Sequence, residues 1–504
     1  MSGLKEKVAK GAIWVTLEKL ATQVVGFVVG MVLARLLTPT DYGTVAMLSI
    51  FFAIAGSIVN CGFGNALVQK KDVGDLEFNS VFYISVGMSL VVYVVLFMAA
   101  PHIAEFYKMP VLCPVTRVSA ISFVLNAINS IQGAELMRKM LFHLRFRISL
   151  ITSAVSSIAG ISFALMGFGV WALVWSSLLA SIAGVCAYWM IIAWRPKWMF
   201  SFAAVKPLFS YGWKLSLSGM IHTIYMNLYG FLVGRFYTPA DLAYVNKGNA
   251  MPSLLMNTID GTILGVSFPA LAKLQDDKTR LRDAMRRMIQ CSTFLVIPLM
   301  FGLAVCARPL ILSLYGNQWG GAVPYVCIYC FSYALWPFNS INTAAISAMG
   351  RSDVYLLLEC VKKFSGLAIM LISIRYGVLV FIASMCFIMA PFSVFVNTFA
   401  NGRLLHYSPW MQIRDVAPSA FCGALMCGIV WCVQQLIEPL MRLCPNSVVG
   451  MLGELIVSFC VGVTAYFVLA RMFRLKALRE YLDAALPVLR TKMPFVARMM
   501  EKLV

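Results

Sequence analysis

Apolar runs of about 20 residues recur along the whole chain, and this feature limits the fold more than any other. Runs such as SVFYISVGMSLVVYVVLFMAA are long enough to cross about 30 Å of hydrocarbon as a helix. Of the 504 residues, 61% are hydrophobic and only 12% are charged, which is too apolar for a fold in water. Strands of a membrane barrel would alternate in polarity over about 10 residues, and these runs do not. The sequence therefore predicts an all-α integral membrane protein.

Hydropathy predicts about fourteen transmembrane helices. The expected spans are 11–36, 41–64, 80–100, 114–136, 148–166, 169–193, 207–234, 239–270, 289–314, 322–349, 354–374, 376–400, 415–438 and 448–470.

The net charge of +20 reports on membrane topology. Of the 41 Lys and Arg, about 29 lie at one set of alternating span ends and about four at the other ends. By the positive-inside rule both termini face the cytoplasm. The basic ends also attract anionic lipid headgroups. No nucleic acid is expected as a partner.

A short motif with the pattern R-x-x-T-P-x-D occurs twice, as RLLTPTDYG from Arg35 and as RFYTPADLA from Arg235. Threonine is a good N-cap, proline suits the first helical turn, and an acid three residues after the threonine completes a capping box. The predicted acids are Asp41 and Asp241. Each copy therefore predicts a tight hairpin between two membrane helices, at the outer mouth.

The sequence around the two hairpins is also shared. Each copy follows a G-F-x-V-G stretch and precedes, after one more span, an A-L stretch with basic residues and glutamine, ALVQKKD and ALAKLQDD. This order indicates two parallel six-helix repeats. The expected divisions are an N-lobe at 1–206, a C-lobe at 207–405, two extra helices at 406–473 and a basic amphipathic cytoplasmic tail at 474–504.

One further stretch, FPALAKLQDDKTRLRDAMRRM from Phe268, resembles the polysaccharide-transporter family of the MOP (MATE-like) superfamily. Three other stretches resemble the same family, namely CGFGNALVQKKD, LYGNQWGGAVPYV and AMGRSDVYLLLECVKK. The similarity covers roughly the first 400 residues. The nearest likeness is to exporters of colanic and teichuronic acid. The resemblance implies two lobes around a central cavity, alternating access, and an undecaprenyl-diphosphate-linked oligosaccharide that moves from the inner to the outer leaflet.

A diphosphate in a membrane pathway needs cations, and a charge inside a span is costly unless it faces water or a partner. The ionisable residues inside the spans are therefore the site candidates. Expected cavity residues, with polar or aromatic neighbours that could meet sugars, are Lys19, Arg117, Trp213, Lys214, Lys247 and Asn249. For Lys19 and Lys214 the alternative is that the side chains reach the cytoplasmic headgroups.

Two acids are candidates for coupling transport to H+ or Na+, namely Asp260 and Glu18. The alternative for each is a structural ion pair with a cation on a neighbouring helix. Arg35 and Arg235 could assist anion exit, or could anchor the hairpins by bonding helix-end carbonyl groups. We expect no bound cofactor or metal, because no nucleotide motif occurs, the four histidines are dispersed and Cys327 with Cys330 has no second pair nearby.

The favoured function is a flippase that acts as a monomer, with anionic lipids and a glycan polymerase or glycosyltransferases as candidate partners. Within the superfamily, the alternatives are a lipid II flippase and a cation-coupled drug antiporter. A membrane enzyme such as a glycan polymerase or an acyltransferase is a third class. It would need a large outer loop or a cluster of histidines and carboxylates, and the sequence offers neither.

Overall fold

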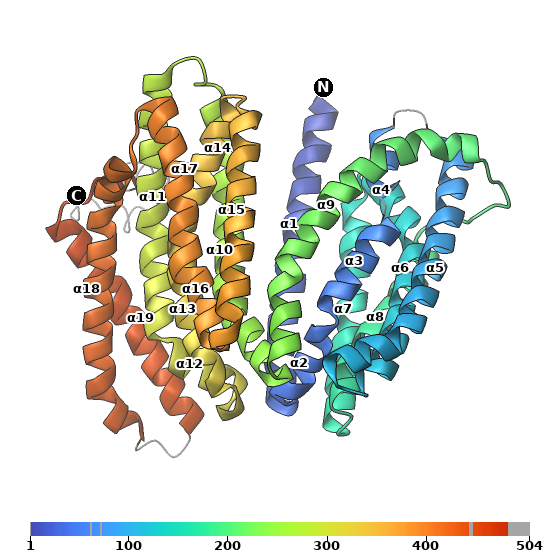
Figure 1. The fold of residues 1–504 in the computed structure, drawn as a ribbon, viewed down its shortest axis with the longest axis horizontal. Coiled ribbons are helices and arrows are strands. Elements are labelled where there is room, and N and C mark those ends of the chain that lie inside the picture. Colours follow the sequence, from blue (N-terminus) through green and yellow to red (C-terminus); the bar gives the residue numbers. More distant parts are fainter. Residues whose placement is uncertain (1, 61–62, 71–72, 443–446, 482–504) are drawn as a thin grey trace. The chain divides into compact units, whose positions relative to one another are not determined.

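The computed structural model describes residues 2–60, 63–70, 73–442 and 447–481 (Figure 1). A few side chains inside these ranges, Lys214 among them, lie outside the described part. The described ranges consist of helices and short connections with no strand, which confirms the all-α prediction.

The chain divides into two compact units, Met1–Ala243 (unit 1) and Tyr244–Val504 (unit 2). The helices of unit 1 are α1 (Ser2–Leu36), α2 (Pro39–Met47), α3 (Ser49–Asn60), α4 (Phe63–Gln69), α5 (Asp75–Tyr107), α6 (Leu112–Arg138), α7 (Phe142–Leu165), α8 (Val170–Ile191) and α9 (Phe202–Phe236).

The helix α10 (Pro239–Ala272) begins in unit 1 and continues into unit 2. The remaining elements of unit 2, with η3 as a single π-helical turn, are α11 (Lys278–Val305), α12 (Ala307–Tyr315), η1 (Asn317–Ala322), α13 (Val323–Ala334), α14 (Trp336–Ala348), α15 (Ser352–Ser373), η2 (Ile374–Tyr376), α16 (Val378–Ser384), η3 (Met385–Met389), α17 (Ala390–Leu405), α18 (Pro409–Arg442) and α19 (Ser447–Met472).

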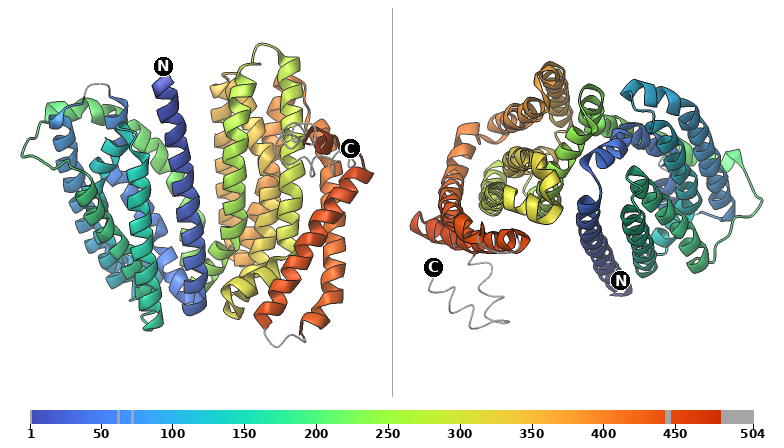
Figure 2. Two further views of the ribbon diagram at one scale, coloured as in Figure 1. Left: turned by 180° about the vertical axis from the view of Figure 1, so that it is seen from behind. Right: turned by 90° about the horizontal axis from the view of Figure 1, so that it is seen from below.

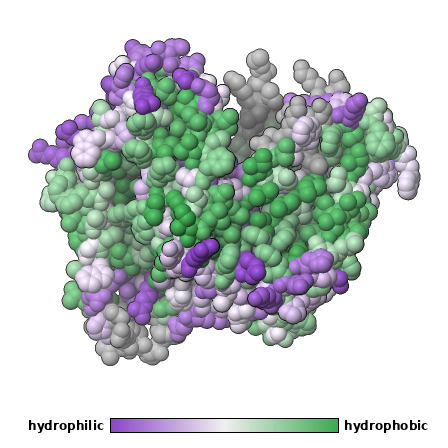
Figure 3. Space-filling model, viewed as in Figure 1, coloured by the Kyte–Doolittle hydropathy of each residue, from purple (hydrophilic) through white to green (hydrophobic). Residues whose placement is uncertain are grey.

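Eleven helices in the described part are long and apolar enough to cross a membrane. The number is up to twelve if α2 and α3, which are bent by 41° at their junction, form one span. On the face drawn in Figure 3, hydrophobic residues fill most of the middle of each unit and hydrophilic residues concentrate toward the helix ends. This distribution matches a multi-pass membrane protein, while the expected number of fourteen spans stays a prediction.

In unit 1, α1 packs along α7, α7 along α8, and α5 along α6. The long helix α9 packs against α3, α4 and α5, and belongs to this compact unit. The sequence repeat instead assigns 207–234 to the second lobe. The lobe boundaries concern the repeat and not compactness, so they stay a prediction.

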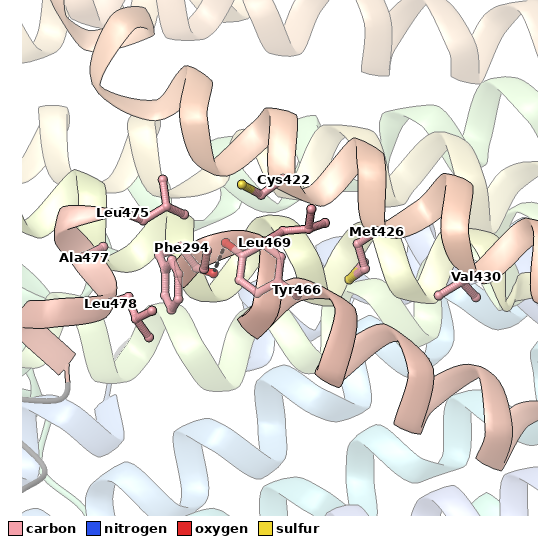
Figure 4. Packing of buried hydrophobic residues seen from close by; sticks show 10 residues of the cluster. Phe294, Cys422, Met426, Val430, Tyr466, Leu469, Leu475, Ala477 and Leu478 are labelled. Atoms are coloured by element: carbon pink, nitrogen blue, oxygen red, sulfur yellow. Dashed lines mark hydrogen bonds between the residues drawn. The ribbon is translucent and has the colours of Figure 1, made fainter. Parts of the chain in front are cut away.

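In unit 2, α11 packs against α13 and α18, and α14 packs against α17. The last two helices, α18 and α19, lie side by side at the edge of the unit (Figure 2). Their shared core includes Met426 and Val430 from α18 and Tyr466 from α19, whose hydroxyl donates to the carbonyl oxygen of Phe294 on α11 at 3.0 Å (Figure 4). This bond and the surrounding apolar contacts fix the terminal helix pair on α11.

Both predicted hairpins have the expected capping box. At α2 the backbone N–H and hydroxyl of Thr38 donate to Asp41 Oδ2 at 2.9 and 2.6 Å, and the Asp41 N–H donates back to the hydroxyl. At α10 the N–H and hydroxyl of Thr238 donate to Asp241 Oδ2 at 3.1 and 2.7 Å. The helices that precede the two hairpins, α1 and α9, have the same length of 35 residues.

The two hairpin copies differ at their ninth residue, which is Gly43 in the first and Ala243 in the second. A β-carbon on Gly43 would lie 1.7 Å from the carbonyl oxygen of Pro239, because the backbones of α2 and the start of α10 touch there. Only glycine fits at this position.

One expectation about the cytoplasmic connections is wrong. The mixed basic and apolar residues from Lys273 to Arg287 predict a helix lying on the anionic inner leaflet. Its residues from Lys278 onward are instead the first turns of α11, which runs without a break to Val305. The helix starts at Asp277, whose side chain accepts the N–H groups of Thr279 and Arg280 at 3.0 Å each.

Candidate functional site

A cavity of about 400 Å³ lies inside unit 1, among the helices α3 to α8. We call it the unit 1 groove. Its lining comes from α3 to α8 and consists of Gly56, Val59, Asn60, Phe63, Gly64, Ser85, Phe123, Asn126, Ala127, Ser130, Ile131, Gly133, Ala134, Met137, Arg145 and Tyr188.

Seven of the sixteen lining residues have uncharged polar or aromatic side chains. Two amides, Asn60 and Asn126, and the hydroxyl groups of Ser130 and Tyr188 supply both donors and acceptors. Such a set can match sugar hydroxyl groups, which themselves donate and accept. A concave site with apolar walls and a few polar groups is the usual form of a small-ligand site.

Arg145 of α7 is the single cation among the lining residues. Its Nε lies 3.1 Å from Glu18 Oε1 on α1, and the hydroxyl of Ser149 donates to the same oxygen at 2.8 Å. The Glu18 side chain is only 11% exposed, whereas that of Arg145 is 42% exposed. Glu18 thus fixes the guanidinium through its Nε. The other N–H groups of the arginine can donate to an anion in the groove.

Two glycines leave the groove open next to its rings. A β-carbon on Gly133 would lie 3.7 Å from the Tyr188 hydroxyl, and one on Gly56 would lie 3.6 Å from the Phe123 ring. Both distances are ordinary contacts, so an alanine fits at either position. A larger side chain there would occupy the space beside the ring.

A second polar region lies in unit 2 and is hydrogen-bonded within itself, except that the buried Asn401 Oδ1 has no hydrogen-bond partner among the described residues. We call it the amide network, and its members on α14, α17 and α18 are Asn339, Asn342, Thr343, Ser393, Asn397, Asn401 and Gln412. Asn342, Asn401 and Gln412 are fully buried. A buried amide is costly unless it is hydrogen-bonded, which explains why these residues converge.

The centre of the network is Asn342. Its amide nitrogen donates to Gln412 Oε1 at 2.9 Å, and its oxygen accepts from Asn401 at 2.8 Å and from Gln412 at 3.2 Å. A second group surrounds the Asn339 oxygen, which accepts from Ser393 and Asn397 at 3.0 Å each. These bonds join α14, α17 and α18.

Asp260 of α10 lies beside this region. It accepts a hydrogen bond from the hydroxyl of Ser340, the residue that follows Asn339 on α14. Asp260 is half-buried. The structure therefore places this acid at the edge of the amide network, and an ion-coupling role stays a prediction.

The predicted cavity cations of unit 1 whose side chains are described, Lys19 and Arg117, do not line the groove. Arg117 lies on the Phe97 ring, with its guanidinium carbon 4.2 Å from the ring centre, and Nε donates to the Phe97 carbonyl oxygen. Lys19 is exposed, and Trp213 is 43% exposed. The side chain of Lys214 lies outside the described residues. Of the described side chains in this set, none lines the groove.

The predicted residues of unit 2 contact its own aromatic residues. Lys247 Nζ lies 4.8 Å from the ring centre of Tyr315 and 5.4 Å from that of Trp319, and both rings are buried. Asn249 Oδ1 accepts from the hydroxyl of Tyr333 at 3.0 Å. Substrate contact by these two residues stays a prediction.

At the hairpins, the Arg235 guanidinium carbon lies 4.9 Å from the ring centre of Phe106, and Arg35 is exposed. Asp41 and Asp241 are engaged in their capping boxes. A part in anion exit remains a prediction for both arginines.

The groove and the amide network were missed by a search restricted to ionisable residues. A signal for both was present, because a helix places residues four apart on one face. Asn126 and Ser130 have this spacing on α6, and Ser393, Asn397 and Asn401 repeat it on α17. A search for uncharged polar residues at four-residue intervals in the spans would have found them.

The helices, their apolar faces and the polar groove define a multi-pass helical membrane protein with a buried polar site. Residues 32–324, more than half of the chain, match the model of the family described as "Polysaccharide biosynthesis protein". The chain belongs to this family.

Two relatives carry informative names. The succinoglycan biosynthesis transport protein ExoT of Rhizobium meliloti is 23% identical over 472 residues, which cover 94% of each chain. The lipopolysaccharide biosynthesis protein WzxC of Escherichia coli K12 is 24% identical over 373 residues, 72% of this chain and 74% of the relative.

A solved structure shares the fold. The lipid II flippase MurJ, in an inward closed conformation, superposes with a TM-score of 0.69 over 91% of this chain and 98% of that chain. The sequence identity is 14%, so the likeness concerns the fold. Fold and family together agree with a membrane transport protein of polysaccharide biosynthesis.

Proposed function

We propose that this chain is a flippase that moves an undecaprenyl-diphosphate-linked oligosaccharide, a polysaccharide repeat unit, from the inner to the outer leaflet by alternating access. The family, the names of the relatives and the fold support a transporter and not an enzyme. In this proposal the protein lies in the bacterial inner membrane, has about fourteen spans in two parallel six-helix repeats plus two helices, and has both termini in the cytoplasm.

The unit 1 groove is the observation that carries the proposal. An apolar bundle has no structural need for a cavity with two asparagines, two serines and a tyrosine among its lining residues. Such groups suit a glycan, which forms many hydrogen bonds but carries its phosphate charge at one end. Arg145 supplies a cation for that end, and Glu18 fixes its position.

In this proposal the groove lies in the cytoplasmic half of unit 1, as the charge bias of the loops predicts. Arg145 lies in the first turn of α7, directly after a connection expected on the cytoplasmic side. A substrate arriving from the inner leaflet would meet this region first. A reporter fused after Arg145 is therefore expected to have cytoplasmic activity, and an outside signal would overturn the topology.

The decisive experiment compares two neighbouring arginines. Arg145→Gln should lower export of the glycan by about tenfold or more, because one charge-assisted contact to phosphate is lost. Arg147→Gln removes the same charge from an exposed position that does not line the groove, and should leave export unchanged. Equal export by both variants at equal protein level would remove the groove from the pathway.

The experiment needs one structural control, because Arg145→Gln leaves Glu18 without its cation. The double variant Glu18→Gln with Arg145→Gln removes both charges together. If the double variant regains export, the loss came from an unpaired buried acid and not from lost phosphate binding. Continued loss in the double variant supports the proposal.

The glycan distinguishes the proposed substrate from lipid II. Purified protein in vesicles can be offered either lipid II or an undecaprenyl-diphosphate oligosaccharide from the producing cell. Flipping of the second and not the first supports the proposed substrate class. Flipping of lipid II alone overturns it.

The proposal also includes coupling of transport to an ion gradient. We propose Asp260 as the coupling acid, because it borders the amide network and accepts only a hydroxyl hydrogen bond among the contacts described for it. Asp260→Asn should abolish the dependence of flipping on an H+ or Na+ gradient while it keeps the side-chain volume. An unchanged dependence would assign the coupling elsewhere.

A further inference from the structure

A second cavity, of about 460 Å³, lies in unit 2 near the N-terminal turns of two helices and the C-terminal end of a third. It is bounded by the early turns of α11 and α18 and by the turn that follows α19. We call it the basic pocket, and its lining residues are Arg286, Gln290, Met411, Arg414, Asp415, Pro418, Ser419, Phe473, Arg474, Leu475, Lys476 and Ala477.

Four basic side chains and one carboxylate line this pocket. The carboxylate, Asp415, is already satisfied, because it forms an ion pair with Arg286 and accepts from the Tyr407 hydroxyl at 2.8 Å. Burial and this hydrogen bond raise the pKa of Tyr407, so its hydroxyl remains a donor. Asp415 therefore serves to hold Arg286 in place.

The other three cations, Arg414, Arg474 and Lys476, form no ion pair with any carboxylate in the described ranges of the chain. Like charges that converge without a counterion repel one another, and the repulsion is relieved when an anion binds between them. Arg286 and Arg414 come from two different helices, and the other two come from the segment that follows α19. The pocket thus has a net positive charge from three separate segments.

The backbone at Arg474 is in the left-handed region, with a φ of 50°. The N–H of Arg474 bonds to the Arg471 carbonyl and that of Leu475 to the Ala470 carbonyl, each at 3.0 Å, which is a Schellman motif. Glycine is the favoured residue at this position, because a β-carbon there is strained. An arginine at a position suited to glycine indicates a use for its side chain.

The core beneath the pocket fixes this turn. Leu475 and Ala477 are buried in the cluster around Phe294 and Tyr466 (Figure 4), while Arg474 and Lys476 between and beside them are exposed. The alternation places the apolar residues in the core and leaves the charges at the pocket.

The rim of the pocket is apolar. Phe473 is 44% exposed and Met411 is 40% exposed, and the Phe473 ring meets the exposed ring of Phe421 edge to face with centres 5.5 Å apart. An exposed apolar rim beside a cationic cavity suits a ligand with an anionic head and an acyl chain. A free phosphate ion would use only the cations.

We propose that the basic pocket binds the phosphate diester headgroup of an anionic membrane phospholipid. In the topology expected from the loop charges, the start of α11, the start of α18 and the end of α19 all lie at the cytoplasmic leaflet. Arg414, Arg474 and Lys476 hold the phosphate, and Phe473 and Met411 contact the upper acyl chain. The proposal does not depend on the transported substrate.

The test measures lipid binding to the purified full chain in detergent. Dioleoyl phosphatidylglycerol should bind about tenfold tighter than dioleoyl phosphatidylcholine, which has the same acyl chains and no net charge. Bound lipid is counted by native mass spectrometry, and the melting temperature is recorded with increasing lipid.

Arg474→Gly is the informative variant, because glycine suits the left-handed turn and the fold is kept or strengthened. It should bind phosphatidylglycerol about tenfold more weakly than the unchanged chain. Arg479→Gln is the matched control, since Arg479 is exposed on the same terminal segment and does not line the pocket. Its affinity for phosphatidylglycerol should not change.

Three outcomes would overturn the proposal. One is equal affinity for the two lipids. Another is an equal loss in Arg474→Gly and Arg479→Gln, which would indicate a diffuse charge effect. The third is stabilisation by inorganic phosphate, lost in Arg474→Gly, with none from phosphatidylglycerol, because the ligand would then be a soluble phosphate. Selective binding of phosphatidylglycerol that only Arg474→Gly weakens supports it.

Discussion

The unit 1 groove and the amide network of unit 2 contain the same kinds of side chain in opposite situations. In the groove, the amides of Asn60 and Asn126 line a cavity. In the network, Asn401 and Gln412 both bond to Asn342, and all three residues are fully buried. An open set of polar groups is available for a ligand, whereas a closed set joins helices. Polar residues in membrane helices therefore cannot be assigned a role from composition alone.

The largest expected effect concerns stability and the closed network. Asn342→Ala leaves Gln412 Oε1 without its donor, at about 1–3 kcal/mol for a buried unsatisfied group, while the amide nitrogens of Asn401 and Gln412 keep backbone carbonyl partners. The free energy of unfolding should therefore fall by about 1–3 kcal/mol, measured in detergent by denaturant titration.

Asn257→Ala is the matched control, because Asn257 is exposed on α10. It should change the free energy of unfolding by less than about 0.5 kcal/mol. If Asn342→Ala and the control are equally stable, the network does not join the helices.

The second effect concerns transport and the open groove. The double variant Asn126→Ala with Ser130→Ala removes two groups from the lining and should lower export about fivefold to tenfold, at roughly 1 kcal/mol per lost hydrogen bond to the glycan. Stability should change little, since neither side chain joins two helices in the contacts described; Ser130 donates to the Ala127 carbonyl on its own helix.

Ser122→Ala on the same helix provides the comparison, because Ser122 bonds to the Ser119 carbonyl and does not line the groove. Its export should equal that of the unchanged protein. A double variant with normal export, or one that unfolds as readily as Asn342→Ala, would erase the distinction between the two regions.

The smallest effect concerns the two helix N-caps, whose polar contacts belong neither to the groove nor to the amide network. Thr38→Ala and Thr238→Ala each remove one N-cap and should lower the free energy of unfolding by about 1 kcal/mol, with export per folded molecule unchanged. The measurement is the same denaturant titration, and Thr40→Ala is the control because Thr40 is exposed on α2. A loss of export in either cap variant at normal stability would give the hairpins a part in transport.

The local features of this chain could be predicted from sequence, because their causes lie within a few residues. The capping boxes at Thr38 and Thr238 require only a threonine, a proline and an acid at fixed spacing. The spans require only hydropathy. The prediction of a helix on the membrane surface before α11 was wrong for a physical reason. A helix can continue from the bilayer into water, so the polarity change near Arg287 marks no helix end.

The site could not be predicted in the same way, because its residues meet only in the folded bundle. Glu18 and Arg145 lie on α1 and α7, and nothing in either segment specifies the other. A list of charged residues also favoured Arg117 and Lys247, which lie against aromatic rings. The uncharged groove residues would have required a search for spacing instead of charge.

The contact at Gly43 makes the two hairpin copies unequal. A chimera that places the second hairpin sequence at the first site would put the methyl group of an alanine against the Pro239 carbonyl, and it should not assemble. The single reverse substitution, Ala243→Gly, only removes a buried methyl group and should be tolerated. The residues at the ninth position of the two copies can therefore be exchanged in one direction only.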